Sequence, residues 1–189
     1  MRYSRYFRCF ASSLLPVLWG IAHLFMLWKG ACTISGSKYP IMVVSSESME
    51  PAFRRGDLIL LWNQQEHIRA GDIPVVWFPG RPLPMVHRAI KVSYKITNRS
   101  EPARYFRLAS NRVDHMLIWY RQLILTKGDN NEVDDVLLYP KGRSSVYRQE
   151  IVGLVIGYIP HVGRLILALK ERSEVFLVAV LLVVAGILL

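Results

Sequence analysis

The sequence predicts an all-β domain, barrel-like or built from folded sheets, with an N-terminal transmembrane helix and a short C-terminal hydrophobic helix. Long apolar runs lie near both ends of the chain, and shorter apolar runs between them are broken by Gly, Pro, Asn and Asp. The shorter runs have strand length and many β-branched and aromatic residues, without a helical period. The 189 residues suffice for one domain with a core, but not for two enzymatic domains.

The composition indicates a membrane protein. The chain carries 24 Lys and Arg against 14 Asp and Glu, a formal net charge of +10, yet 52% of its residues are hydrophobic. A nucleic-acid-binding protein would gather its basic residues into a run or patch that follows phosphates, whereas here they are dispersed among apolar strands. We therefore expect a lipid bilayer as a partner and no nucleic acid.

Residues 10–28 form the first apolar run, in which His23 is the only ionisable side chain. Its length approaches the ~20 residues needed to cross the hydrocarbon core. Arginines in residues 1–9 predict that this segment stays in the cytosol and that the rest crosses the membrane. A cleaved signal peptide is the competing interpretation, but its apolar region has only about 7–15 residues. We expect an uncleaved signal anchor and a single-pass type II topology.

Residues 30–170 are expected to form the β domain, and residues 175–189 a short membrane-associated helix. A helix of about 15 residues is roughly 22 Å long, less than the ~30 Å hydrocarbon core. It must therefore lie in the interface, end inside the bilayer or sit where the bilayer is thinned. In the β domain, strands are expected near residues 39–45, 57–62, 73–78, 84–92, 104–109, 122–126 and 151–160.

Ser48 follows an expected strand, in the stretch SSESMEP, and is the candidate nucleophile. A serine hydroxyl needs a neighbouring base to take its proton. The β domain contains His67, His87, His115 and His161, of which only His87 lies in a tight apolar run, PMVHRAI. Strand alternation would place that imidazole on one face. Taken singly, each histidine also fits a structural role, and Ser48 fits a turn.

An acidic turn supplies candidates to orient the base. The stretch TKGDNNEVDD contains Asp129, Asp134 and Asp135. Its Gly, Asn and Asp are also typical of a simple turn between strands. The spacing does not match the calcium loop of EF-hands, so we expect no metal and no cofactor. Which of the three carboxylates orients the base stays open at this point.

Four stretches together resemble the type I signal peptidases. SSESMEPAFRRGDLI, GDIPVVWF, MVHRAIKV and LTKGDNNEVDD occur in the order of that family's motifs, behind a signal anchor. The resemblance extends from the anchor to about residue 160 and includes the short terminal helix. Histidine stands where bacterial members and the related self-cleaving repressors have lysine. The sequence is therefore most similar to the catalytic subunit of the eukaryotic endoplasmic-reticulum complex, or to its archaeal relatives.

This resemblance assigns a role to each candidate residue. It implies that Ser48 is the nucleophile and His87 the general base. It implies that Ser46 donates its hydroxyl to the oxyanion hole, beside the backbone N–H of Ser48. Asp135 resembles the acid of the triad, and Asp129 resembles a second catalytic aspartate that supports the site.

The same resemblance implies a membrane-bound serine endopeptidase that removes N-terminal signal peptides from preproteins at the lumenal face of the endoplasmic reticulum. It also implies accessory subunits of the signal peptidase complex and a location near the protein translocon. Two features depart from the family. Glu47 stands where glycine is usual, and the stretch between His87 and Thr126 is longer, which predicts an insertion in a surface hairpin. Asn98 begins a glycosylation sequon, NRS.

Two other functions stay open on sequence grounds. A membrane-anchored β domain could retain these motifs and act as a non-catalytic scaffold, an alternative that the Glu47 departure keeps open. A bacterial or archaeal surface signal peptidase could use a similar mechanism. Cleavage activity separates the first alternative from the expected peptidase, and the source of the chain and its accessory subunits separate the second.

Overall fold

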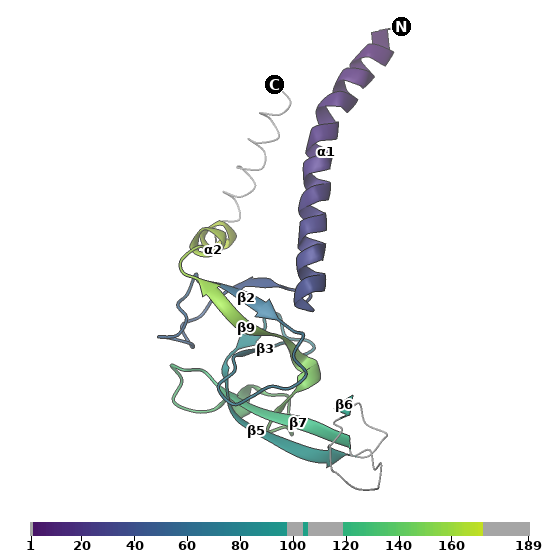
Figure 1. The fold of residues 1–189 in the computed structure, drawn as a ribbon. Coiled ribbons are helices and arrows are strands. Elements are labelled where there is room, and N and C mark those ends of the chain that lie inside the picture. Colours follow the sequence, from purple (N-terminus) through teal and green to yellow (C-terminus); the bar gives the residue numbers. More distant parts are fainter. Residues whose placement is uncertain (1, 98–103, 106–118, 172–189) are drawn as a thin grey trace.

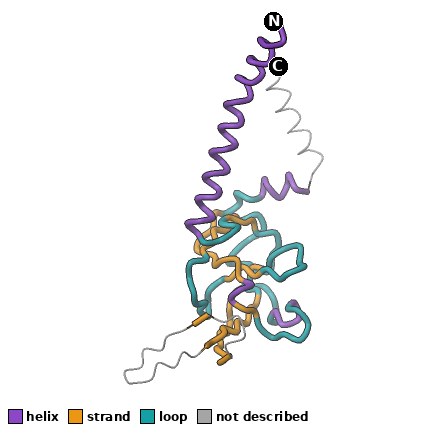
Figure 2. Tube along the Cα trace, turned by 90° about the vertical axis from the view of Figure 1, so that its right-hand side faces the viewer, coloured by secondary structure: helices purple, strands orange, loops and turns teal. Residues whose placement is uncertain are grey.

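The computed structural model describes residues 2–97, 104–105 and 119–171. A long helix, α1 (Arg2–Ser35), projects away from a mainly β domain (Figures 1 and 2). This confirms the expected combination of a β domain with an N-terminal apolar helix. The expected C-terminal helix at residues 175–189 and the sequon at Asn98 lie outside the described residues.

Helix α1 is longer at both ends than the apolar run of residues 10–28. Its segment Leu14–Ser35 is long and apolar enough to cross a membrane, and the apolar 18-residue window within it is not buried inside the described structure. The helix ends at Ser35 and is followed by Gly36, whose φ of 67° is the left-handed conformation common after a helix. The backbone N–H of Asn63 donates to the carbonyl of Ser35 at 2.7 Å. The end of α1 is therefore fixed to the β domain.

The β domain contains a five-stranded sheet in the order β1-β2-β9-β3-β4. Each neighbouring pair in this sheet is antiparallel. The strands are β1 (Ile41–Val43), β2 (Leu58–Trp62), β3 (Pro74–Val76), β4 (Met85–Val86) and β9 (Ile151–Ile159). After β9 the chain enters a short helix, α2 (Arg164–Glu171), which Figure 1 shows at the same end of the domain as the base of α1.

A second sheet has the order β5-β7-β6, and β8 also pairs with β7. Its strands are β5 (Arg88–Thr97), β6 (Arg104–Tyr105), β7 (Trp119–Lys127) and β8 (Val146–Tyr147). Two 3-10 turns, η1 (Asp135–Leu138) and η2 (Arg148–Glu150), lie between β7 and β9. The sequence pattern did not predict β8, which has only two residues.

The single strand expected at residues 84–92 is two strands, one in each sheet. Strand β4 pairs with β3 in the first sheet, and β5 pairs with β7 in the second. The register shifts between Ala89 and Lys91, a β-bulge that bends the chain. His87 lies at the crossing between the sheets, because it follows β4 directly and precedes β5 directly.

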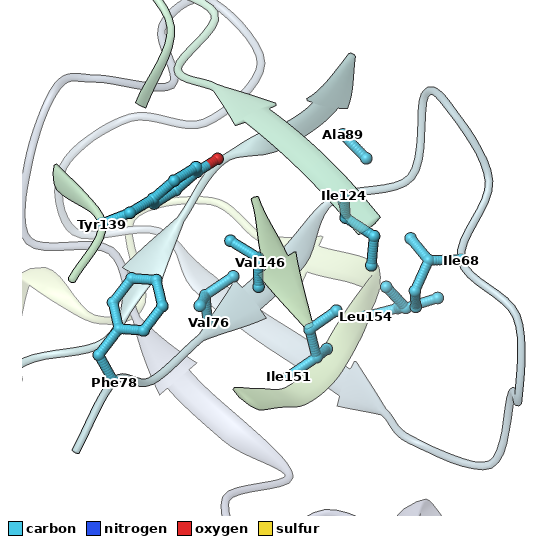
Figure 3. Packing of buried hydrophobic residues seen from close by; sticks show 9 residues of the cluster. All are labelled: Ile68, Val76, Phe78, Ala89, Ile124, Tyr139, Val146, Ile151 and Leu154. Atoms are coloured by element: carbon cyan, nitrogen blue, oxygen red, sulfur yellow. The ribbon is translucent and has the colours of Figure 1, made fainter. Parts of the chain in front are cut away.

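Two clusters of buried side chains form the core. The larger cluster, shown in Figure 3, lies between the sheets and consists of Ile68, Val76, Phe78, Ala89, Ile124, Tyr139, Val146, Ile151 and Leu154. The smaller cluster packs beneath the first sheet and consists of Val44, Met49, Phe53, Ile59, Leu61 and Val75. One core therefore supports the sheet crossing, and the other supports the loop that follows β1.

The described strands of the long stretch between His87 and Thr126 extend away from the rest of the domain. Strands β5 and β7 pair continuously along a ribbon, apart from the bulge, from Arg88 opposite Lys127 to Thr97 opposite Trp119. Figure 1 shows this ribbon at the end of the domain opposite α1. The described part of the ribbon fits the expectation that the additional residues belong to a surface hairpin.

Candidate active site

The loop after β1 presents Ser48 at the surface because its neighbour is anchored in the core. The Met49 side chain is 1% exposed in the smaller cluster, and the Phe53 N–H donates to the Met49 carbonyl at 3.0 Å. Met49 thus fixes the backbone and turns the adjacent Ser48 outward, where it is half-buried. The Ser46 hydroxyl lies 3.2 Å from the Ser48 hydroxyl. The two serines of the motif are therefore in contact.

Ser48, His87 and Asp135 form a continuous chain of hydrogen bonds. The His87 Nε2 atom lies 3.0 Å from Ser48 Oγ, and the His87 Nδ1 atom lies 2.7 Å from Asp135 Oδ2. A carboxylate only accepts hydrogen bonds, so Nδ1 carries the ring proton and Nε2 of the neutral imidazole accepts the Ser48 proton. The Ser46 hydroxyl then donates to Ser48 Oγ. The His87 Nε2 atom is thus placed to accept the Ser48 proton.

The structure also separates the three carboxylates of the acidic turn. Asp135 begins η1, is 1% exposed and contacts His87. Asp134 caps η1 from outside, accepting from the Val136 N–H at 3.2 Å. Asp129 lies nearby but pairs with Arg88. Of the two adjacent aspartates, Asp135 is therefore buried and Asp134 is exposed to solvent.

Asp129 and Arg88 form a two-pronged ion pair beside the triad. The Arg88 Nε and Nη2 atoms donate to the two carboxylate oxygens at 2.8 and 2.6 Å. This hydrogen-bonded guanidinium holds the pKa of Asp129 below its usual value, and Asp129 in turn raises the pKa of Arg88. Arg88 also donates to the Gly71 carbonyl at 3.0 Å. The pair ties β5 to the acidic turn.

The acidic turn also holds the serine loop through its backbone. The Asn130 N–H donates to the Ser48 carbonyl at 2.9 Å, and the Asn130 side chain donates to the Glu47 carbonyl at 3.2 Å. At Gly128 the two segments approach so closely that a Cβ would lie 2.6 Å from the Ser48 carbonyl oxygen. Glycine is therefore required sterically there, and residues 128–130 fix the position of Ser48 relative to His87.

A buried pair of hydroxyls lies behind Asp135. Thr126 Oγ1 donates to Asp135 Oδ2 at 2.6 Å and lies 2.9 Å from the hydroxyl of Tyr139. The Thr126 N–H also donates to that hydroxyl at 2.9 Å. Burial raises the pKa of Tyr139, so its phenol is neutral at ordinary pH.

The other histidines do not join the site. His67 is exposed on a loop, and His115 lies outside the described residues. His161 has a φ of 64° and its N–H donates to the buried Asp57 carboxylate at 3.0 Å. Of the histidines that the structure describes, His87 alone contacts the candidate nucleophile.

A groove of about 490 Å³ passes over Ser48 and His87. Its lining comes from two segments, residues 39, 41–46 and 48–49 in the first and residues 83–87 in the second. These segments contain β1 and β4, the two ends of the five-stranded sheet. The sheet therefore curls until its two edges border the same groove, and Ser48 and His87, in hydrogen-bond contact, lie together in its lining.

Sequence reasoning did not single out Arg88, Thr126, Asn130 or Tyr139 as site residues. Arg88 directly follows His87, and Asn130 directly follows Asp129. Their position next to motif residues could have identified them as candidates. Tyr139 carries no such signal, because only the packing of η1 against β7 brings its hydroxyl to the site.

Comparison with known proteins identifies close relatives, although no family model matches the chain. A protein of Aspergillus terreus named signal peptidase complex catalytic subunit sec11 is 40% identical over 169 residues, which cover 89% of this chain and 84% of the relative. The protein of that name in Talaromyces marneffei is 44% identical over 165 residues, covering 87% and 82%. The one in Komagataella phaffii is 37% identical over 161 residues, covering 85% and 84%. By this similarity over most of both chains, the protein belongs to the family of signal peptidase complex catalytic subunits.

Proposed function

We propose that this chain is a membrane-bound serine endopeptidase that removes N-terminal signal peptides from secretory and membrane preproteins. In this proposal Ser48 is the nucleophile, His87 the general base and Asp135 the acid that orients the base. The hydrogen-bond chain from Ser48 through His87 to Asp135 carries the proposal. A serine needs a neighbouring base to become a nucleophile, and this chain supplies and orients one, whereas a scaffold has no use for it. The catalytic role named for the relatives supports the same function.

The mechanism follows from the orientation of the protons. His87 Nε2 takes the proton of Ser48 as Oγ attacks the carbonyl carbon of the scissile peptide, and the carbonyl oxygen becomes an oxyanion. The Ser48 N–H and the Ser46 hydroxyl donate to that oxygen, which stabilises charge present only in the transition state. His87 then gives its proton to the departing amine. A water molecule, activated by His87, hydrolyses the acyl-enzyme and restores Ser48.

The groove would accept the substrate as an extended strand. Both β1 and β4 offer backbone groups at a sheet edge, so a peptide lying between them could pair with main chain on either side. The walls near the serine are apolar, with Met42, Val44 and Val86 among the lining residues. We therefore expect uncharged side chains before the cleaved bond, with small ones preferred where the walls close in.

The position of the groove favours cleavage close to a membrane. Tyr39, one of the residues that line the groove, follows the end of α1 by four residues, a reach of at most about 14 Å. Exposed apolar side chains also lie at the end of the domain next to the base of α1, on the last part of β9, the loop after it and α2. They include Tyr158, Val162 and Leu165. We propose that α1 spans the endoplasmic-reticulum membrane once, in type II orientation, and that the β domain lies on the lumenal side.

Other subunits are part of this proposal. The relatives are named as catalytic subunits of a complex, which supports accessory membrane subunits for this chain. A location near the translocon follows from the substrate, because signal peptides enter the membrane there. Asp129, paired with Arg88, is assigned a supporting role in the site.

Cleavage of a labelled preprotein by the reconstituted complex tests the proposal. We expect Ser48→Ala and His87→Ala to reduce kcat by more than about a thousandfold. Ser93→Ala is the matched control, since Ser93 is an exposed serine on β5 outside the groove. Unchanged processing by Ser48→Ala would support the scaffold alternative and end the proposal. Protection of the β domain from protease in sealed vesicles tests the lumenal assignment.

A further inference from the structure

We infer that Thr126 and Tyr139 are positioning residues that hold the Asp135 carboxylate and, through it, the proton on His87. The inference rests on the proposed function, because it concerns the efficiency of the same site. Neither residue belongs to the groove lining. Their effect must therefore pass through Asp135 rather than through contact with a substrate.

The directions of the hydrogen bonds follow from the chemistry of the groups. Asp135 Oδ2 accepts from Thr126 Oγ1 at 2.6 Å and from His87 Nδ1 at 2.7 Å. The Thr126 hydroxyl proton is thus committed to the carboxylate. In the 2.9 Å contact between Thr126 Oγ1 and the Tyr139 hydroxyl, the phenol must therefore be the donor. The protons run in one direction, from Tyr139 to Thr126 to Asp135.

Tyr139 is held in place from two sides. Its hydroxyl accepts from the Thr126 backbone N–H at 2.9 Å. Its ring lies in the larger core cluster and meets Phe78 edge-on, with centroids 5.9 Å apart. Figure 3 shows the ring beside Phe78 with the hydroxyl directed away from it. The relay from Tyr139 to Thr126 is therefore as rigid as the core that contains it.

The relay matters because Asp135 receives its described hydrogen bonds through one oxygen. Asp135 Oδ1 is buried and has no hydrogen-bond partner among the described residues. Without the Thr126 hydroxyl, the carboxylate would keep a single bond, to His87, and could rotate about its terminal torsion. Thr126 and Asp135 are 0% and 1% exposed, so solvent is poorly placed to replace the lost donor. The imidazole would then lose its fixed orientation toward Ser48.

Three substitutions test the relay in the reconstituted complex. Thr126→Val keeps the shape and removes the donor to a charged acceptor, so we expect kcat to fall about 10- to 100-fold, with KM nearly unchanged. Tyr139→Phe removes only the outer donor and keeps the ring, and should lower kcat by about 3- to 10-fold. Thr126→Ser retains the hydroxyl and should restore most of the activity.

A pH profile separates positioning from simple loss of folded protein. Removal of the Thr126 donor leaves the charge of Asp135 less compensated, so Asp135 attracts the imidazolium more strongly. We expect the acid limb of kcat/KM to move to higher pH in Thr126→Val but not in Thr126→Ser. The other charged or titratable groups that face this pair are Arg88 and Asp129 near His87, and Asp134 and Tyr139 near Asp135. Thr126→Val leaves all four in place.

The concentration of folded complex is measured by gel filtration and circular dichroism, so that kcat refers to folded enzyme alone. The inference is overturned if Thr126→Val has wild-type kcat per active site and an unshifted acid limb, whatever its thermal stability. Ser48→Ala is measured in parallel. Full cleavage by that variant refutes the proposed function itself, whereas an inactive Ser48→Ala beside a fully active Thr126→Val refutes only the relay.

Discussion

The acid side and the nucleophile side of the site are built in contrasting ways. Asp135 and Thr126 lie within the packing of the two sheets and are almost completely buried. Glu47 and Ser46 are exposed, and their loop is tied to the acidic turn by the contacts of Asn130. The difference separates two requirements. Burial excludes water from the charge that orients the base, while the exposed loop leaves the hydroxyl accessible to a peptide.

Asp135→Asn should disrupt the buried acid side of the site and cause the largest loss of activity. An amide at this position can offer an N–H to the imidazole, which favours the tautomer with its proton on the wrong nitrogen. We expect kcat to fall by about 10³- to 10⁴-fold. Asp134→Asn is the control, since Asp134 caps η1 from outside. Equal activities of the two variants would remove Asp135 from the triad.

Gly128→Ala should displace the nucleophile side while leaving the acid in place. The new methyl group would meet the Ser48 carbonyl oxygen at 2.6 Å, so the serine loop must shift. A misplacement of about 1 Å can cost up to about 100-fold in rate, and we expect a 10- to 100-fold loss of kcat. In Gly157→Ala the new Cβ would meet Leu60 at an ordinary 3.9 Å. Similar losses in both variants would contradict the steric explanation.

The ion pair between Arg88 and Asp129 should make stability depend on pH in the acid range. Because the hydrogen bond from Arg88 lowers the pKa of Asp129 below 3.8, the folded carboxylate binds its proton less readily than the unfolded one. Its stabilisation, about 1 kcal/mol or less for a partly exposed pair, is present above about pH 4 and lost as pH falls through the lowered pKa. Denaturant midpoints from pH 6 to pH 3 should fall less steeply in Asp129→Asn. Identical slopes would show that the pair does not contribute.

Glu47→Gln should have the smallest effect on activity. It tests the exposed nucleophile side of the site without altering the buried acid side. The Glu47 side chain is exposed, and the loop is held through the Glu47 carbonyl, which accepts from Asn130 and from the Glu50 N–H. We expect kcat to change by less than about twofold, since an exposed charge is well screened. A tenfold change, measured at low and high salt, would show that this carboxylate acts on the oxyanion.

The sequence allowed the β class and most strand positions to be predicted, because apolar runs between turn residues carry that information. The division of the run at residues 84–92 could not be predicted. The strand-like pattern of this run continues through His87, so nothing in the sequence marks a break there. The bulge after Ala89 depends on the pairing of β5 with β7. The two-residue strand β8 was missed because so short a segment has no period.

The candidate site residues that lie within the sequence motifs could be predicted. Ser48, His87 and the acidic turn could be named from their order in the chain, and the structure brings them together. The resemblance pointed to Asp135, but the residues alone could not choose among the carboxylates, because Asp134 and Asp135 are neighbours whose directions depend on where η1 begins. Tyr139 reaches the site through tertiary packing alone.

The pairing of β5 with β7 has a practical consequence. Thr97 lies about ten residues along the ribbon from His87, roughly 30 Å for an extended chain, and is held opposite Trp119. A fluorophore or affinity tag attached at this last described pair of the ribbon would lie far from the triad. It would also leave the opposite end of the domain free to meet lipid. This end of the ribbon is therefore the place at which to immobilise or label the working enzyme.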